Sequence, residues 1–378
     1  MDYHFNETAL HMLQVLNQAG FESWFVGGCV RDIILKKPFN DYDIATRAKP
    51  ADVIGLFSKK FELDQKGRRY GCVRVCYEGI WYDITSLRKD VNQDGRRTGI
   101  VYTDDLKEDA SRRDFTVNAL YWNQNGFVDF FNGQQDLAEH RVRFIGDASQ
   151  RVHEDYLRIL RFLRFSSRYA DEFDVEGVKA CYENREFLRY LSGERVWDEW
   201  QKILFQSGTL RILRLMAESD MDMTLFGGKF DLQHYEAYQG NDSLLLTRLL
   251  LPFIHNEHLV QRLSLDFKEK MWLKTADGLF PSENFRELYL KYGGSVKELV
   301  WYWAAKYKKN AQEIFQHSFW QVKDPQFPLT GQDILNLGCQ PGPIVGDYLE
   351  RARLWWVKND FIPSYEDCLN YAKSLLNP

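Results

Sequence analysis

Apolar and polar residues alternate along the first ~140 residues with two periods, one typical of helices and the other of strands. From Thr8 to Ala19 the apolar residues recur at helical spacing, which predicts an amphipathic helix. Ser23–Val26 and Asp41–Thr46 are bounded, mainly apolar runs, and we expect both to be strands. Ala51–Phe61 is predicted to be a helix, because Pro50 suits its start.

The pattern changes from mixed to helical about midway along the chain. Gly71–Tyr77 and Trp81–Ser86 are strand-like and are joined by Glu78-Gly79, which predicts a hairpin. Beyond Arg151 the strand signals fade and helical periodicity dominates. We therefore expect an α+β protein, with a head made of a small mixed sheet and helices, followed by an all-helical neck, body and tail. The expected boundaries are 1–140 for the head, 141–205 for the neck, 206–290 for the body and 291–378 for the tail.

Composition and charge narrow the class of protein. The 378 residues allow two or more domains, and their 44% hydrophobic content is ordinary for a globular protein. No apolar run reaches the length of a membrane span, and the N-terminus lacks the shape of a signal peptide. The six cysteines form no disulfide framework or zinc spacing. We expect a cytoplasmic protein with reduced thiols, no membrane partner and a monomeric state.

The net charge of −5 argues mildly against a nucleic-acid partner. However, the charge is segregated, because Arg151–Arg168 contains five arginines and two acidic residues. Local potential steers a polyanion more than net charge does.

The most informative segment is Phe25–Asp32, with Asp41 and Asp43 shortly after it. Gly27-Gly28 lets the backbone approach phosphate oxygens, and Arg31 adds a forked cation. On a strand, residues two apart share a face, so the two aspartates can hold divalent metal beside a bound triphosphate. Oxygen ligands of this kind suit Mg²⁺. The combination predicts nucleotidyl transfer.

At this point the chain resembles the class II tRNA nucleotidyltransferase and bacterial poly(A) polymerase family, within the polymerase-β-like nucleotidyltransferases. The resemblance covers about residues 20–205. The sequences of several of its segments look most like those of α-proteobacterial CCA-adding enzymes. After the Gly-Gly block, it is carried in order by Arg112–Leu120, Asp129–Leu137, Arg143–Asp147, Glu154–Arg161, and Glu194-Arg195 with Glu199-Trp200-Lys202. Asp83 departs from the glutamate that related sequences often carry, and it is either a third metal-site carboxylate or a charged hairpin end.

The resemblance implies roles for individual residues. Asp41 and Asp43 would be the catalytic metal ligands. Asp114 has the alternative role of a helix cap. The triphosphate and sugar site would comprise Gly27, Gly28, Arg31, Asp32, Arg112, Arg113 and Asn118.

The predicted helix from about Val152 to Ser167 has two interpretations. Tyr156, Leu160 and Leu163 form its core face, and Asp155, Arg158, Arg161 and Arg164 recur every three residues as a second stripe. That stripe alone is typical of a surface ladder of ion pairs. In the resembling family, the matching Asp and Arg select the base. Asp155 would accept a hydrogen bond from the exocyclic amine of cytosine or adenine, and would face an unpaired carbonyl on uracil or guanine.

The polar segment from Arg88 to Thr103 is predicted to be a loop. It is either a plain connector or, as in family enzymes, a flexible loop needed for adenosine addition, with Asp94, Arg96 and Arg97 as its charged residues.

The expected function is template-independent addition of C, C and A to the 3′ end of tRNA. CTP and ATP would be the substrates and Mg²⁺ the cofactor, with pyrophosphate released, and the tail would bind the acceptor and T-arm. Three alternatives stay open: a poly(A) polymerase, favoured by Gly67-Arg68-Arg69-Tyr70, a CC-only or A-only enzyme, and a non-enzymatic RNA-binding protein.

Overall fold

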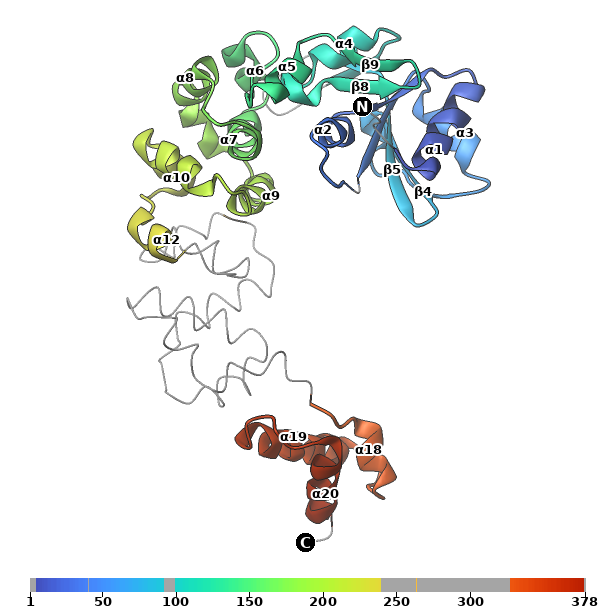
Figure 1. The fold of residues 1–378 in the computed structure, drawn as a ribbon, viewed down its shortest axis with the longest axis vertical. Coiled ribbons are helices and arrows are strands. Elements are labelled where there is room, and N and C mark those ends of the chain that lie inside the picture. The colour runs from blue at the N-terminus through green and yellow to red at the C-terminus, as the bar shows by residue number, and fades with distance from the viewer. Residues whose placement is uncertain (1–4, 40, 92–98, 239–262, 264–326, 377–378) are drawn as a thin grey trace. The chain divides into compact units, whose positions relative to one another are not determined.

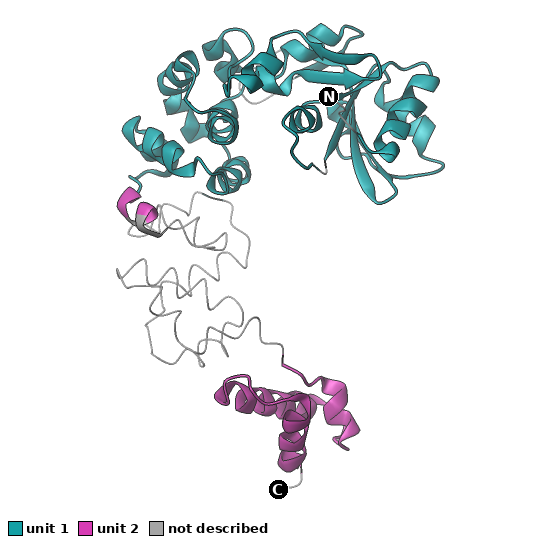
Figure 2. Cartoon of the chain, viewed as in Figure 1, with its two compact units in different colours: residues 1–230, 262–264 teal, residues 231–261, 265–378 magenta. Residues whose placement is uncertain are grey.

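A computed structural model describes residues 5–39, 41–91, 99–238, 263 and 327–376 of the chain (Figure 1). The chain divides into two compact units (Figure 2). The first comprises residues 1–230 with 262–264, and the second comprises residues 231–261 with 265–378. None of the described helices is long and apolar enough to cross a membrane.

The first unit begins with a mixed sheet of seven strands. β2 (Tyr42–Thr46) and β5 (Ile80–Ser86) pair in parallel, and every other neighbouring pair in this sheet is antiparallel. The sheet order is β3-β4-β5-β2-β1-β8-β9. The remaining strands are β1 (Ser23–Val26), β3 (Glu62–Asp64), β4 (Cys72–Tyr77), β8 (Leu120–Asn123) and β9 (Gly126–Asp129). The predicted hairpin is confirmed as β4–β5, and the predicted α+β class is confirmed.

Two helices, α1 and α3, lie on one side of this sheet (Figure 1). α1 (Glu7–Gln18) begins at Asn6, whose side chain accepts the backbone N–H of Ala9 at 2.7 Å. Its apolar stripe is buried as predicted. α3 (Pro50–Phe57) begins at the predicted proline, but it ends four residues before the predicted end at Phe61.

The segment Arg88–Thr103, predicted to be a loop, instead contributes strands at both ends. β6 (Arg88–Val91) and β7 (Gly99–Tyr102) pair as a separate antiparallel ribbon. Backbone hydrogen bonding satisfies polar strands as well as apolar ones, so polarity alone was misleading here. Asp94, Arg96 and Arg97 lie outside the described residues. The short elements around the sheet are α2 (Gly28–Ile34), the 3₁₀ helix η1 (Arg68–Tyr70), α4 (Leu106–Ser111), the 3₁₀ helix η2 (Thr116–Asn118) and α5 (Gly133–Ala138).

Helices follow the sheet in the rest of the first unit. The predicted single helix from Val152 to Ser167 is wrong, because α6 (Ala148–Glu154) and α7 (Leu157–Tyr169) are separated by Asp155 in an extended conformation. The Asp155 carboxylate accepts the backbone N–H of Leu157 at 3.1 Å, so it competes with helix continuation. The later elements are α8 (Val175–Glu183), the 3₁₀ helix η3 (Arg185–Tyr190), α9 (Gly193–Leu204), α10 (Thr209–Glu218) and α11 (Met221–Phe226).

The second unit is helical where it is described. Its elements are α12 (Leu232–Tyr238), α18 (Gly331–Asn336), α19 (Pro343–Lys358) and α20 (Tyr365–Leu376). The last three helices share a core that includes Ile334, Trp356 and Cys368. The Trp356 indole N–H donates to the Pro363 carbonyl at 3.0 Å, as expected of a buried tryptophan with a polar edge.

Candidate functional site

The Gly-Gly turn connects β1 to α2 at one end of the sheet. Gly27 has φ 71° and ψ −117°, a conformation that residues with a Cβ rarely adopt. A Cβ on Gly27 would lie 3.5 Å from Arg113 Nη1, and a Cβ on Gly28 would lie 3.7 Å from Arg31 Nη2. Two guanidinium groups therefore flank the bare backbone of the turn. This arrangement can bind phosphate oxygens from both side chains and main chain.

The two predicted metal ligands lie at the start of β2. Tyr42 and Ile44 are buried, and the alternation of a strand puts Asp41 and Asp43 on the opposite face. Burial raises the pKa of Asp43 to about 6. Arg113 opposes this rise, while the neighbouring Asp83 and Asp41 add to it.

The Asp43 carboxylate has no hydrogen-bond or ion-pair partner among the described residues. A desolvated carboxylate without a partner is costly by itself, and a divalent cation would compensate it. The donor set of Asp41 and Asp43 fits Mg²⁺, which keeps its other positions for water and substrate phosphates. No group of three or more His, Cys, Asp and Glu suited to a metal occurs in the described part of the chain.

Asp83 lies directly beside Asp43, because the two residues are partners in the parallel pairing of β2 and β5. Its carboxylate forms an ion pair with Arg74 Nε at 2.6 Å, and the Arg74 guanidinium lies over the Trp81 ring. Both proposed roles of Asp83 therefore have a structural basis: it is close to the metal pair, and it is held by a charged neighbour on the hairpin.

Asp109, a buried carboxylate of α4, was not among the predicted site residues. It forms ion pairs with Arg112 at 2.7 Å and with Arg113 at 3.4 Å, and it accepts the Tyr121 hydroxyl at 2.7 Å. The spacing carried a usable signal, since residues three and four apart on a helix are neighbours. The two arginines predicted to contact triphosphate are thus fixed by one carboxylate.

Asn118 connects the Gly-Gly turn to the helical part of the unit. Its side-chain oxygen accepts a hydrogen bond from Arg31, and its amide donates to Asp114 at 2.9 Å. The other oxygen of Asp114 pairs with Arg161 Nη2 at 2.6 Å. These contacts hold the pKa of the buried Asp114 at about 2, against the opposing effect of burial. Asp114 is therefore a buried bridge between side chains, and its position as a helix cap was an incorrect expectation, because Phe115 occupies the N-cap of η2.

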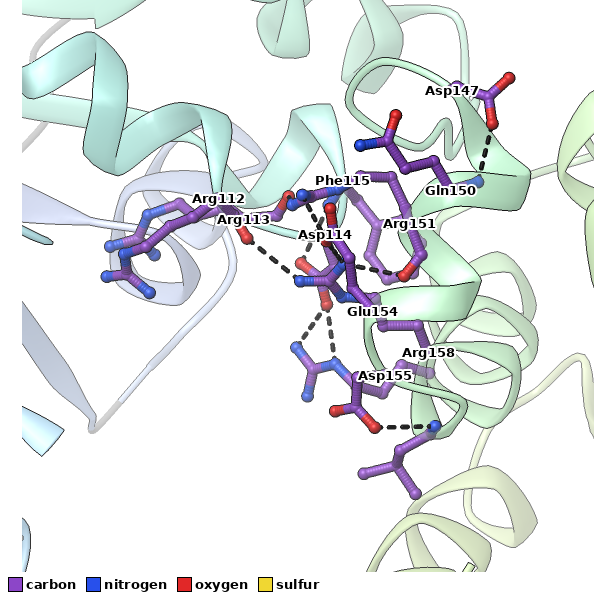
Figure 3. A network of polar contacts seen from close by, with 12 residues as sticks. Arg112, Arg113, Asp114, Phe115, Asp147, Gln150, Arg151, Glu154, Asp155 and Arg158 are labelled. Atoms are coloured by element: carbon purple, nitrogen blue, oxygen red, sulfur yellow. Dashed lines mark hydrogen bonds and ion pairs between the residues drawn. The ribbon is translucent and has the colours of Figure 1, made fainter. Parts of the chain in front are cut away.

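Asp155 and Arg158 do not pair with each other. Asp155 forms an ion pair with Arg195 of α9 at 2.7 Å. Arg158 pairs with Glu154 and donates to the backbone carbonyls of Arg151 at 2.8 Å and Arg112 at 3.2 Å (Figure 3). Arg158 is buried in this conformation, while the Asp155 side chain is one-third exposed. Of the two, Asp155 has the more accessible polar group.

Arg161 and Arg164, the remaining residues of the predicted stripe, form ion pairs with residues of other segments and not with residues of α7. Arg161 and Arg164 both contact Glu199 of α9, the latter at 2.7 Å. The interpretation as a surface ladder of ion pairs is therefore wrong, because the buried carboxylate of Glu199 on the neighbouring helix forms ion pairs with both arginines. Asp32 contacts Arg168 at 3.8 Å and the Tyr169 hydroxyl at 3.3 Å, so its side chain turns toward α7.

Comparison with known proteins shows which families and relatives the chain is similar to. Residues 23–143 match the family described as "Poly A polymerase head domain". Residues 172–226 match "Probable RNA and SrmB-binding site of polymerase A". The chain is 29% identical to human "CCA tRNA nucleotidyltransferase 1, mitochondrial" over 98% of its own length and 90% of the relative's. It is 38% identical to the CCA-adding enzyme of Lactobacillus helveticus over 62% of its length and 60% of the relative's.

The fold of the chain is also similar to that of solved structures. The Bacillus stearothermophilus CCA-adding enzyme in complex with CTP matches with a TM-score of 0.65 and 26% identity, covering 98% of this chain and 97% of that one. A Thermotoga maritima CCA-adding enzyme complexed with tRNA matches in fold with a TM-score of 0.61 at 20% identity, over 98% and 95% of the two chains.

The chain is a nucleotidyltransferase, and its residues 23–143 are similar to the head domain of the poly(A) polymerases. The relatives and the solved structures to which it is similar are CCA-adding enzymes. The prediction of an enzyme of this type is confirmed.

Proposed function

We propose that this enzyme adds C, C and A in succession to the 3′ end of tRNA without a nucleic-acid template. The tRNA 3′-hydroxyl attacks the α-phosphate of CTP or ATP, and pyrophosphate leaves. The observation that carries the proposal is Asp43, a desolvated carboxylate without a partner among the described residues, beside Asp41 and near Arg113. Each residue of the site has a task that follows from this chemistry.

Asp41 and Asp43 would hold Mg²⁺. When bound, the metal would activate the attacking hydroxyl and stabilise the leaving pyrophosphate. The turn at Gly27 and Gly28 would receive the phosphates through its main chain, with Arg31 and Arg113 on either side.

The same site would place the sugar and the base. Asn118, held by Arg31 and Asp114, would contact the sugar hydroxyls. Asp155 would accept a hydrogen bond from the exocyclic amine of cytosine or adenine. Arg195 would hold the second carboxylate oxygen of Asp155 in place. Arg158 would act on the base only after leaving part of its contacts with Glu154 and Arg112. Arg161 and Arg164 would hold α7 through Glu199.

We further propose an α-proteobacterial type of enzyme, a monomeric state, a cytoplasmic location and tRNA binding by residues 291–378 through the acceptor and T-arm. The domain boundaries at residues 140, 205 and 290 stay predictions, as does the role of Asp94, Arg96 and Arg97 in adenosine addition.

The test is incorporation of nucleotides into tRNA that lacks its 3′ end, with products sized at single-nucleotide resolution. With CTP and then ATP we expect three added nucleotides. Asp41→Ala and Asp43→Ala should each lower the rate at least a thousandfold at saturating Mg²⁺, because the metal clamp contributes several kcal/mol to the transition state. Asp64→Ala is a matched control, since this carboxylate lies on the sheet-edge strand β3. Long adenosine tails would instead identify a poly(A) polymerase, and no incorporation would favour an RNA-binding protein.

A further inference from the structure

Asp109 is a charged side chain with only 1% of its surface exposed. Its two oxygens are divided between two arginines. Oδ1 binds Arg112, at 2.7 Å from Nη2 and 2.9 Å from Nε. Oδ2 binds Arg113 Nη2 at 3.4 Å and also accepts the Tyr121 hydroxyl. Each guanidinium therefore has its own oxygen and a fixed orientation.

Tyr121 strengthens this arrangement from β8. Its hydroxyl donates to Asp109 at 2.7 Å and accepts from Arg113 Nε at 3.0 Å, so it joins the two charged groups. The Arg113 guanidinium also lies near the Tyr121 ring, 5.3 Å from its centroid. Arg113 is thus held on two sides while its Nη1 remains next to the turn at Gly27.

Asp109 also connects the arginines to the ribbon. The backbone N–H of Arg88, the first residue of β6, donates to Oδ1 at 3.2 Å. Arg112 Nε in turn donates to the Arg88 carbonyl at 3.1 Å. The position of Arg112 is therefore set by the carboxylate and by the strand together.

The charges explain why an anion belongs beside this group. Two arginines share one carboxylate, which leaves a net positive charge on the group, and Arg113 is the member of the group that lies next to the Gly-Gly turn. Burial raises the pKa of Asp109, but Arg113, Arg112 and the Tyr121 hydroxyl more than offset that effect and bring the pKa below its ordinary value. The carboxylate consequently stays ionised near neutral pH and keeps two like charges close together.

We propose that Asp109 is a positioning residue that sets Arg112 and Arg113 for the phosphates of the incoming nucleotide. Figure 3 shows the two arginine side chains pointing away from Arg151 and Arg158, which hold the backbone behind them. This inference rests on the proposed triphosphate site, and it adds the residue that fixes the geometry of that site.

The test measures binding of inorganic pyrophosphate with Mg²⁺ by calorimetry, which needs no turnover. Asp109→Asn keeps the shape but removes the charge, and we expect about tenfold weaker binding. The KM for CTP should rise by about the same factor, with kcat within about threefold, because the lost interaction is with the phosphates in both the ground and transition states. Asp222→Asn is the matched control, since Asp222 is also buried and ion-paired but belongs to α11.

Tyr121→Phe keeps the inference testable if Asp109→Asn does not fold. It removes only the hydroxyl between Asp109 and Arg113, and we expect about threefold weaker pyrophosphate binding. Unchanged pyrophosphate binding in a folded Asp109→Asn or Tyr121→Phe protein would overturn the inference. Pyrophosphate binding by a wild-type protein that fails to extend tRNA would overturn the proposed function alone.

Discussion

Asp114 and Arg161 are 47 residues apart in the sequence and form a partly buried ion pair, with Arg161 Nη2 2.6 Å from Asp114 Oδ2. The pair joins the segment between α4 and η2 to α7. Asp114 reaches the Gly-Gly turn through Asn118, and Arg161 reaches α9 through Glu199. The phosphate end of the site and the helix that carries Arg158 are therefore joined by one series of polar contacts.

This ion pair predicts a pH dependence of stability. The pKa of Asp114 is lowered to about 2, so its contribution is fully present above the ordinary value near 4 and is lost as pH falls through 2. We expect the contacts of the Asp114 carboxylate with Arg161, Asn118 and Arg158 to contribute together about 2 kcal/mol to the unfolding free energy at pH 6 through this shift. Denaturant unfolding at several pH values between 6 and 2.5 would measure it. Asp114→Asn should flatten that part of the profile, and an unchanged slope would contradict the assignment.

For Asp43 we predict a pH dependence of stability with the opposite sign. Its pKa is raised to about 6, so in the metal-free protein the ionised carboxylate opposes folding above that pH and the neutral form does not. Asp43→Asn should therefore stabilise the metal-free protein by about 1–2 kcal/mol at pH 7.5 while it removes activity. Near pH 4 the gain should vanish. Melting temperatures in EDTA at the two pH values test this, and a destabilised variant at pH 7.5 would mean that Asp43 has a structural partner.

Asp155 predicts selectivity for the base. Asp155→Ala should increase incorporation of UTP and GTP relative to CTP and ATP by about tenfold, because a carboxylate that opposes carbonyl edges is removed. Arg195→Ala should give a smaller change in the same direction, since it frees the carboxylate without deleting it. Competition assays with mixed nucleotides measure the ratio. An unchanged ratio in both variants would leave Asp155 with only its role at the start of α7.

At two glycines we predict that replacement by alanine has opposite effects on the stability of the protein. A Cβ at Gly133 would lie 2.3 Å from the backbone oxygen of Thr116, so Gly133→Ala should destabilise the protein by at least 2 kcal/mol. Gly55 lies within α3 with no atom within 4 Å of such a Cβ, so Gly55→Ala should stabilise by about 0.5–1 kcal/mol. Thermal unfolding of both variants would check the packing, and equal effects would contradict it.

The sequence determined the local elements on which the site is built. The strand Ser23–Val26, the glycine turn after it and the aspartates of the next strand follow from apolar runs, a left-handed glycine and a two-residue period. These are short-range properties, because they depend on residues within a few positions of each other. The same holds for the buried face of α1.

Only the tertiary structure decided where the charged side chains go. The sequence spacing put Asp155 and Arg158 on one helix, whereas Asp155 lies between α6 and α7 and pairs with Arg195, and Arg158 pairs with Glu154. The spacing of Asp109 to Arg112 and Arg113 was compatible with ion pairs, but an acidic residue on a helix is usually solvated, and only the fold shows that this carboxylate is buried against both arginines. The physical reason is that a desolvated charge needs a partner, and the fold decides which charged groups become buried together, whether they are neighbours in the sequence or far apart.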